Sequence, residues 1–119
     1  MKLWLRNGMD RMKKQFPINV THEDIVDVTL EFETDKGKRK IVKFALSYRA
    51  MINGKWYEVI RYDNAHGYVH VQKFWRGHEP IPLKDDEDLP FDYLVKKYKQ
   101  DIVDNWLRYR GYIEVKVKE

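Results

Sequence analysis

Side chains that could carry out acid–base chemistry on a phosphate gather in residues 55–75, which read KWYEVIRYDNAHGYVHVQKFW. Metal-independent RNA cleavage needs a general base for the 2′-hydroxyl, a general acid for the leaving oxygen and a cation for the charge on phosphorus. His70 and His66 can supply the acid and the base. Arg61 can bind the phosphate as a planar fork. The stretch is therefore a candidate site for such chemistry.

Four further residues complete the candidate site. We expect Tyr68 or Arg76 to assist the chemistry, His78 to reach in from the following loop, and Asp63 to bind beside Arg61. A structural interpretation stays open for the same stretch. Asp63 is a residue that hydrogen-bonds turn amides, and histidines within strands are more often structural than catalytic.

A metal site is not expected. His66 and His70 would stand about 13 Å apart along an extended strand, too far for one ion unless the turn curls back. The sequence has no cysteine and no His-Glu-x-x-His motif on a predicted helix. We expect no cofactor either.

The same stretch forms part of a predicted four-stranded antiparallel meander. Residues 25–34 and 38–50 alternate between apolar and polar side chains, and residues 56–63 and 68–75 are rich in aromatic and branched ones. Turns are predicted at 35–37, at Asn53-Gly54 and at the four residues 64–67. Asn-Gly is typical of a type I′ hairpin turn, and Gly67 can adopt positive φ.

Uninterrupted pairing across these turns predicts which side chains meet. If Asp63 faces Tyr68, then Arg61 faces His70 on the next strand. Counting back from Asn53-Gly54 places Leu46 opposite Arg61. We therefore expect Arg61 and His70 to lie side by side at the margin of the apolar face of the sheet.

Helical spacing appears at both ends of the chain. Residues 8–15 are predicted to form a short amphipathic helix that ends at Pro17, and residues 91–110 a long one that ends at Gly111. Residues 76–90 are predicted to be a loop, and residues 112–117 a short final strand. The expected fold class is α+β: a four-stranded antiparallel β-meander with a long C-terminal helix packed on one face and a short N-terminal helix, in a single domain, 1–119.

Composition narrows the class of protein. The absence of cysteine among 119 residues excludes thiol catalysis and disulfide scaffolds and fits a cytoplasmic protein. The sequence predicts no membrane segment. Charged residues make up 35% of the chain, a proportion that suggests a thermophile, and the net charge of +4 favours weak attraction to a polyanion.

Residues 39–109 resemble an uncharacterised family of small archaeal and bacterial proteins. The shared core is Arg-Tyr-Asp-x-Ala-His-Gly, here residues 61–67, followed by His70 and a C-terminal helix. The Tyr-Asp-Asn-Ala stretch is also similar to that of TumE-type toxins of toxin–antitoxin pairs, although the denser histidine cluster of those toxins is missing here. The similarity implies RNA cleavage and a cognate antitoxin-like partner.

Three functions follow as hypotheses. The first is a metal-independent ribonuclease-like toxin or RNA-processing protein. The second is a noncatalytic nucleic-acid-binding module that uses Lys and Arg together with exposed Trp and Tyr. The third is a protein-interaction or accessory subunit whose contact surface is Trp4, Trp75 or the C-terminal helix.

Overall fold

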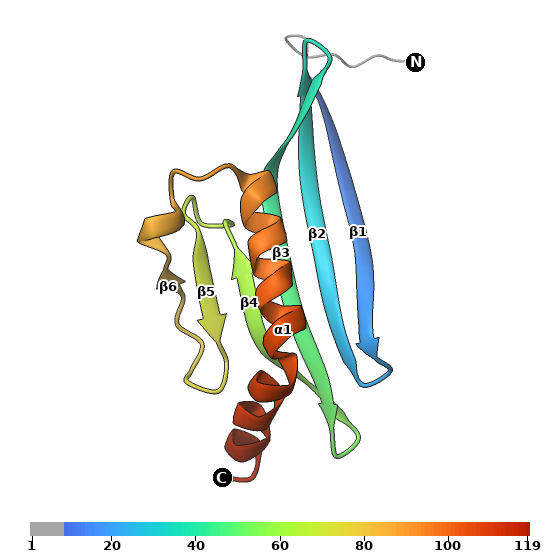
Figure 1. The fold of residues 1–119 in the computed structure, drawn as a ribbon, viewed down its shortest axis with the longest axis vertical. Helices are drawn as coiled ribbons and strands as arrows, with labels where there is room; N and C mark the ends of the chain where they lie inside the picture. The colour runs from blue at the N-terminus through green and yellow to red at the C-terminus, as the bar shows by residue number, and fades with distance from the viewer. Residues whose placement is uncertain (1–8) are drawn as a thin grey trace.

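A six-stranded antiparallel sheet carries one long helix on one of its faces (Figure 1). The computed structural model describes residues 9–119. The strands are β1 Met9–Thr21, β2 Asp24–Asp35, β3 Lys38–Ile52, β4 Lys55–Asp63, β5 His70–Lys73 and β6 Ile81–Pro82; a 3₁₀ turn, Lys84–Asp86, precedes helix α1, Phe91–Val117. Spatial order follows sequence order, so each strand pairs with its neighbours in the chain.

The prediction of four strands and a short N-terminal helix is wrong. Residues 9–21 form β1, which pairs with β2 along its whole length. Phe16, Ile18 and Val20 alternate as in a strand, and Pro17 is tolerated because β1 is the outermost strand. Gly8, at the start of the predicted helix, and Trp4, a predicted contact residue, lie outside the described residues.

The C-terminal helix is longer than expected. It continues through Gly111 to Val117 and replaces the predicted final strand, because Tyr109, Ile113 and Val117 keep the four-residue spacing that faces the sheet. The loop expected at residues 76–90 contains β6 and the 3₁₀ turn. No helix in the described part of the chain is long and apolar enough to cross a membrane.

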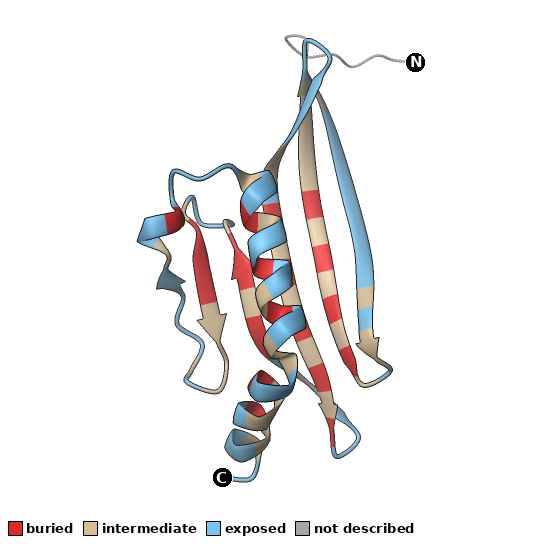
Figure 2. Cartoon of the chain, viewed as in Figure 1, coloured by how far each residue is buried: buried red, intermediate tan, exposed pale blue. Residues whose placement is uncertain are grey.

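The hydrophobic core lies between α1 and the face of the sheet that the helix covers. Buried and half-buried residues alternate along β2 and β3, as expected for strands with one covered face (Figure 2). Tyr62 of β4 stacks flat on Tyr98 of α1, with ring centroids 4.2 Å apart. Complete burial of one such side chain contributes roughly 1.5–3 kcal/mol. We call the opposite face of the sheet the open face.

A β-bulge in β4 changes the face to which the candidate residues point. Pairing with β3 is as predicted near the Asn53-Gly54 turn, where Arg49 faces Glu58. Val59 is then an extra residue, so that Tyr48 faces Ile60 and Leu46 faces Tyr62. The predicted pairing of Leu46 with Arg61 is therefore wrong.

The bulge has a hydrophobic cause. Without it, Arg61 would share the covered face, and Ile60 and Tyr62 would point to the open face. With it, Val59 and Ile60 are both completely buried, and Tyr62 is 9% exposed. Burial of apolar side chains is favourable, whereas burial of a guanidinium without a partner is costly.

Buried and half-buried carboxylates hold α1 in place by accepting hydrogen bonds from tyrosine hydroxyls. Tyr62 of β4 donates to Asp101 of α1 at 2.6 Å. Tyr48 of β3 donates to Asp24 at 2.6 Å, and Arg110 of α1 donates to the same carboxylate at 2.8 Å. Hydrogen bonds to charged groups contribute about 1.5–3 kcal/mol each.

A third bond of this kind holds the start of the helix. Tyr98 and Lys97 of α1 both donate to Asp86 of the 3₁₀ turn, each at 2.8 Å. Burial alone would raise the pKa of Asp86, but the hydrogen bonds from Lys97 and Tyr98 outweigh it and the pKa is lowered. The carboxylate is therefore kept charged.

These contacts shift the pKa values of the tyrosines upward. Burial, followed by the hydrogen bond to a carboxylate, raises the pKa of Tyr48, Tyr62 and Tyr98 far above the usual value of 10.0. The same causes raise the pKa of Tyr109 to about 12. All four hydroxyls stay protonated in the folded protein at neutral pH.

The shifts predict loss of stability in alkali. Because the folded-state pKa values exceed 10.0, the contribution of these tyrosines is complete below pH 10 and is lost as the pH rises above it. The loss should reach about 1.4 kcal/mol per tyrosine for each pH unit above 10. Urea unfolding measured between about pH 8 and pH 11 tests this. Tyr62→Phe should lose less stability over that range, and a midpoint independent of pH would contradict the prediction.

Candidate functional site

Asp63 is the centre of the candidate site. It is the last residue of β4, and its side chain is buried. One carboxylate oxygen, Oδ2, accepts a hydrogen bond from Arg61 Nε at 2.6 Å. The other, Oδ1, lies 2.8 Å from His70 Nε2 and accepts the backbone N–H of Ala65 at 3.0 Å. One carboxylate therefore joins an arginine, a histidine and the following loop.

The pairing of β4 with β5 differs from the prediction by two residues. Asp63 faces His70 and Arg61 faces Gln72, whereas we expected Asp63 opposite Tyr68 and Arg61 opposite His70. The connection spans residues 64–69 instead of four residues, because β5 begins only at His70. A shift by two keeps every side chain on its face. Arg61 and His70 thus share the open face and meet through Asp63, away from the covered apolar face.

His70 is held on both sides of its ring. It is 1% exposed, and its Nδ1 lies 3.2 Å from the carbonyl oxygen of Tyr68, while Nε2 faces Asp63. Each ring nitrogen thus lies within hydrogen-bond distance of an oxygen atom of the protein. His70 therefore presents no free ring nitrogen to the open face in this arrangement.

The loop brings two further rings to His70. The ring of His66, which is exposed, stacks on that of His70 with centroids 5.7 Å apart. Tyr68 lies 5.0 Å from the same ring. The loop curls back because Gly67 has a φ of 85°, which L side chains rarely adopt. His66 is consequently the accessible histidine of the cluster.

Arg76 and His78 stand apart from this cluster. Both lie in the turn after β5 and are exposed, and the backbone N–H of Arg76 bonds to Lys73. His78 packs its ring against Phe74. Within residues 9–119 neither side chain forms a hydrogen bond or ion pair with the cluster, and no group of three or more potential metal ligands comes together.

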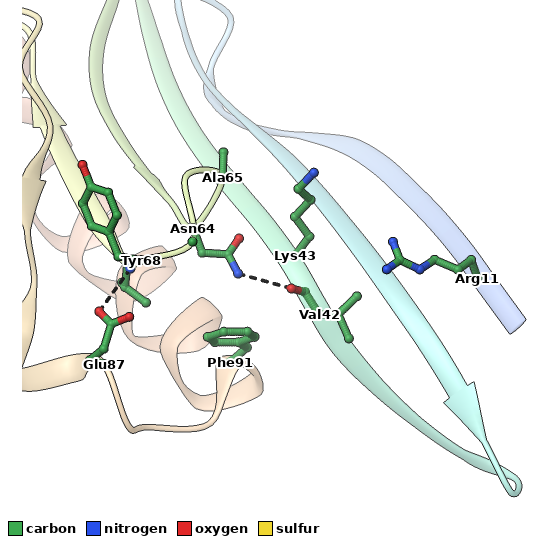
Figure 3. Close-up of a pocket in the computed structure, with 10 residues that line it drawn as sticks. Arg11, Val42, Lys43, Asn64, Ala65, Tyr68, Glu87 and Phe91 are labelled. Carbon is green, nitrogen blue, oxygen red and sulfur yellow. Dashed lines mark hydrogen bonds between the residues drawn. The ribbon is translucent and has the colours of Figure 1, made fainter. Parts of the chain in front are cut away.

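Asn64 fixes the position of the loop. Its side chain replaces a strand at the edge of β3, where Oδ1 accepts the N–H of Phe44 at 3.0 Å and Nδ2 donates to the carbonyl of Val42 at 3.2 Å. Figure 3 shows the hydrogen bond from Asn64 to Val42, and both residues line a pocket of about 360 Å³. Ala65 and Tyr68 line the same pocket.

A second hollow, of about 310 Å³, lies on the open face beside Asp63. Three cations line it: Lys13 of β1, Lys43 of β3 and Arg61 of β4. We call this hollow the cationic groove. Its remaining lining is Gln15, Thr29, Glu31, Phe44, Ala45, Asp63 and Ala65. Lys43 and Ala65 also line the pocket of Figure 3, so the two hollows adjoin.

Ion pairs neutralise much of the open face. Arg49 pairs with Asp27 at 2.7 Å, Arg61 with Asp63 at 2.6 Å, and Lys43 with Glu31 at 4.0 Å. Lys13 forms no ion pair with any residue that the structure describes. The groove therefore presents one unpaired ammonium, one loosely paired ammonium and a guanidinium oriented by Asp63.

The family model described as Domain of unknown function (DUF7718) matches residues 11–117. The chain belongs to this family. The match includes the groove, the Asp63 cluster and the whole of α1. Comparison of this DUF7718 chain with curated proteins gave no match, and neither did comparison with solved structures.

Sequence reasoning missed the carboxylates that accept hydrogen bonds from the tyrosine hydroxyls. We expected the acidic run of residues 85–88 to be a solvated turn, and the sequence pattern singled out neither Asp24 nor Asp101. A signal was present for Asp101 alone. It lies three and four residues from Tyr98 and Asn105, so its side chain borders the buried face of α1.

Loss of the charge on Asp63 should destabilise the protein strongly. We expect Asp63→Asn to lower the free energy of unfolding by about 2–4 kcal/mol, because His70 and Arg61 would lose the carboxylate between them in a buried position. Asp27→Asn is the matched control, since it removes an exposed carboxylate from an ion pair on the same face. The control should cost less than about 1 kcal/mol. Equal effects in urea titrations would contradict the assignment.

Proposed function

We propose that this DUF7718 protein binds single-stranded RNA on the open face of its sheet. The observation that carries the proposal is the cationic groove, in which Lys13, Lys43 and Arg61 surround one hollow beside an exposed histidine loop. Several cations around one hollow suit the phosphates of a flexible strand.

Arg61 is suited to bind a phosphate because its orientation is fixed. Its Nε is bound to Asp63, and its side chain is about one-third exposed. A guanidinium held in this way keeps Nη2 available for a phosphate contact, while Nη1 lies 3.7 Å from a carboxylate oxygen of Glu58. The entropy cost of ordering the side chain is already met in the free protein.

The loop next to the groove offers aromatic rings for unpaired bases. His66 is exposed and Tyr68 is half-buried, and Ala65, next to His66, lines the groove itself. Stacking of a base on such a ring contributes about 1–3 kcal/mol without sequence preference. The net charge of +4 adds a weak general attraction.

Salt dependence of RNA binding tests the proposal. If three phosphates are bound, log K for binding of a short oligouridylate should fall with log [salt] at a slope of about −2. Lys13→Gln and Lys43→Gln should each reduce the magnitude of this slope by about 0.7. The double variant should bind at least about tenfold more weakly at about 0.1 M salt.

Lys96→Gln and Lys118→Gln are the controls, because both lysines are exposed on or next to α1, away from the groove. The proposal fails if binding is insensitive to salt, or if the control variants weaken it as much as the groove variants do.

A second candidate function is metal-independent cleavage of the bound RNA. The specific observation in its favour is the stack of exposed His66 on His70, whose orientation Asp63 fixes. In this mechanism His66 removes the proton of the 2′-hydroxyl, whose oxygen attacks the adjacent phosphorus. Arg61 stabilises the charge on phosphorus, and the Tyr68 hydroxyl protonates the leaving 5′-oxygen.

Cleavage should then persist in EDTA and yield 2′,3′-cyclic phosphate and 5′-hydroxyl ends. His66→Ala should lower the cleavage rate at least about 100-fold with little change in RNA affinity. His22→Ala, at an exposed histidine in the β1–β2 turn, is the matched control and should leave the rate unchanged. Full activity in His66→Ala would exclude this mechanism and leave a noncatalytic RNA-binding module.

The similarity to TumE-type toxins supports the second candidate and adds a partner to it. A toxin of this kind requires a cognate antitoxin-like protein. We expect this antitoxin to be a small DNA-binding protein whose gene lies beside the gene for this chain. We also propose that the chain comes from a thermophilic archaeon, and only the sequence supports this origin.

A further inference from the structure

A strip of apolar side chains on β1 lies beside α1 and is not covered by it. Met12 and Phe16 pair with Phe32 and Val28 of β2, so they share the face of the sheet that carries the core. The helix lies over β3 and β4, and β1 stands to one side of it (Figure 1). Met12 is 47% exposed and Phe16 is 37% exposed. We call these two residues the β1 strip.

The outer side of α1 carries a repeating pattern of charged and apolar side chains. Three pairs lie along it, with four positions between the members of a pair and eleven between successive pairs: Asp92 and Lys96, Val103 and Leu107, Glu114 and Lys118. Four residues make about one helical turn and eleven about three, so the six side chains share one side of the helix. Leu107 is 67% exposed. We call these six residues the α1 ridge.

The α1 ridge lies on the side of the helix that faces the β1 strip. Asp92 lines a groove together with Lys40 of β3. Arg110, three residues after Leu107, donates to Asp24 of β2 at 2.8 Å. A single approach from this side of the molecule can therefore meet both the ridge and the strip.

The charges of the α1 ridge are mostly unused within the chain. Asp92, Lys96 and Lys118 are exposed and form no ion pair with any of residues 9–119. Glu114 has only a loose pair, 3.6 Å from Arg110. All four charges can pair with a partner without breaking a strong contact.

The ridge is complementary to itself when two copies run antiparallel. An arrangement centred on position 105 places Asp92 opposite Lys118 of the second copy and Lys96 opposite Glu114. Val103 then lies opposite Leu107, between the two sets of opposite charges. A parallel arrangement in register would place every charge opposite its own copy. Charge therefore favours an antiparallel second copy as the occupant.

We propose that the protein forms a twofold-symmetric dimer in which two α1 ridges pack antiparallel and the two β1 strips are buried beside them. Packed helices lie about 8–10 Å apart and packed sheets about 10 Å apart, so one approach of the copies suits both contacts. A twofold axis makes both copies use the same surface.

The dimer leaves the proposed RNA site free. The cationic groove lies on the open face, whereas the ridge and the strip lie on the other side of the sheet. Substitution of Lys96 or Lys118 therefore alters dimerisation and leaves the groove unchanged.

Sedimentation equilibrium of the full chain tests the proposal, and a dimer is expected at about 0.1 mM protein. Lys96→Glu should raise the dimer Kd at least about tenfold, because it places carboxylates opposite each other. Lys96→Glu/Glu114→Lys restores opposite charges and should bring the Kd back to within about threefold of the original. Lys84→Glu is the matched control, because it makes the same charge change at an exposed lysine beside β6, at the other edge of the sheet.

Met12→Lys tests the β1 strip separately and should also raise the Kd at least about tenfold. A chain that is monomeric at about 0.1 mM would overturn the proposal, as would a dimer that Lys96→Glu or Met12→Lys leaves unchanged. A dimer that forms only after removal of residues 1–8 would overturn it too, since that segment of the same chain would then cover the surface.

Discussion

The extra residue in β4 is the constraint on which the rest of the structure depends. Val59 and Ile60 are consecutive and both fully buried, which a regular strand with one covered face does not allow. The chain accommodates both by a bulge opposite Tyr48 and Arg49. From there to the end of β4 the alternation is reversed, so that Tyr62 enters the core and Arg61 and Asp63 reach the open face.

This reversal separates the two roles of the Arg61–Tyr62–Asp63 sequence. Tyr62 stacks on Tyr98 and donates to Asp101, and thereby helps to fix α1 on the sheet. Asp63, on the other face, orients Arg61, His70 and the following loop. A contact that stabilises the fold and a contact that shapes the candidate site therefore come from adjacent residues. Changes at either position are expected to affect stability as well as function.

The helix and the open face differ in how they use charge. Beneath α1, Asp24 and Asp86 are buried, and each accepts a hydrogen bond from a tyrosine hydroxyl and pairs with a cation. Asp101 of α1 is half-buried and accepts a hydrogen bond from Tyr62. On the open face the ion pairs are mostly half-exposed and contribute little to stability. Substitution of charged residues on the open face should therefore change the free energy of unfolding little. Lys13 and Lys43, which border the groove, are among these residues.

Several features were predictable because they depend on local sequence. The turns at residues 35–37 and at Asn53-Gly54 are present, Asn53 and Gly54 adopt the expected positive φ, and the strands that flank these turns are correctly placed. The antiparallel sheet and the long C-terminal helix were also correct. The helix predicted at residues 8–15 was wrong. Met9, Met12 and Phe16 fit helical spacing, but residues 9–21 form a strand in which Phe16, Ile18 and Val20 alternate.

The sequence alone determined which residues are grouped near the candidate site. Arg61, Asp63, His66 and His70 lie within ten positions of one another, whichever register the strands adopt. Only the tertiary structure decided which face they occupy and which of them are accessible. The bulge depends on burial under a helix that begins some thirty residues later. The burial of His70 depends on the loop of residues 64–69, which Asn64 holds to β3. Such long-range contacts leave no periodicity in the sequence, because burial across a fold is set by what packs from elsewhere.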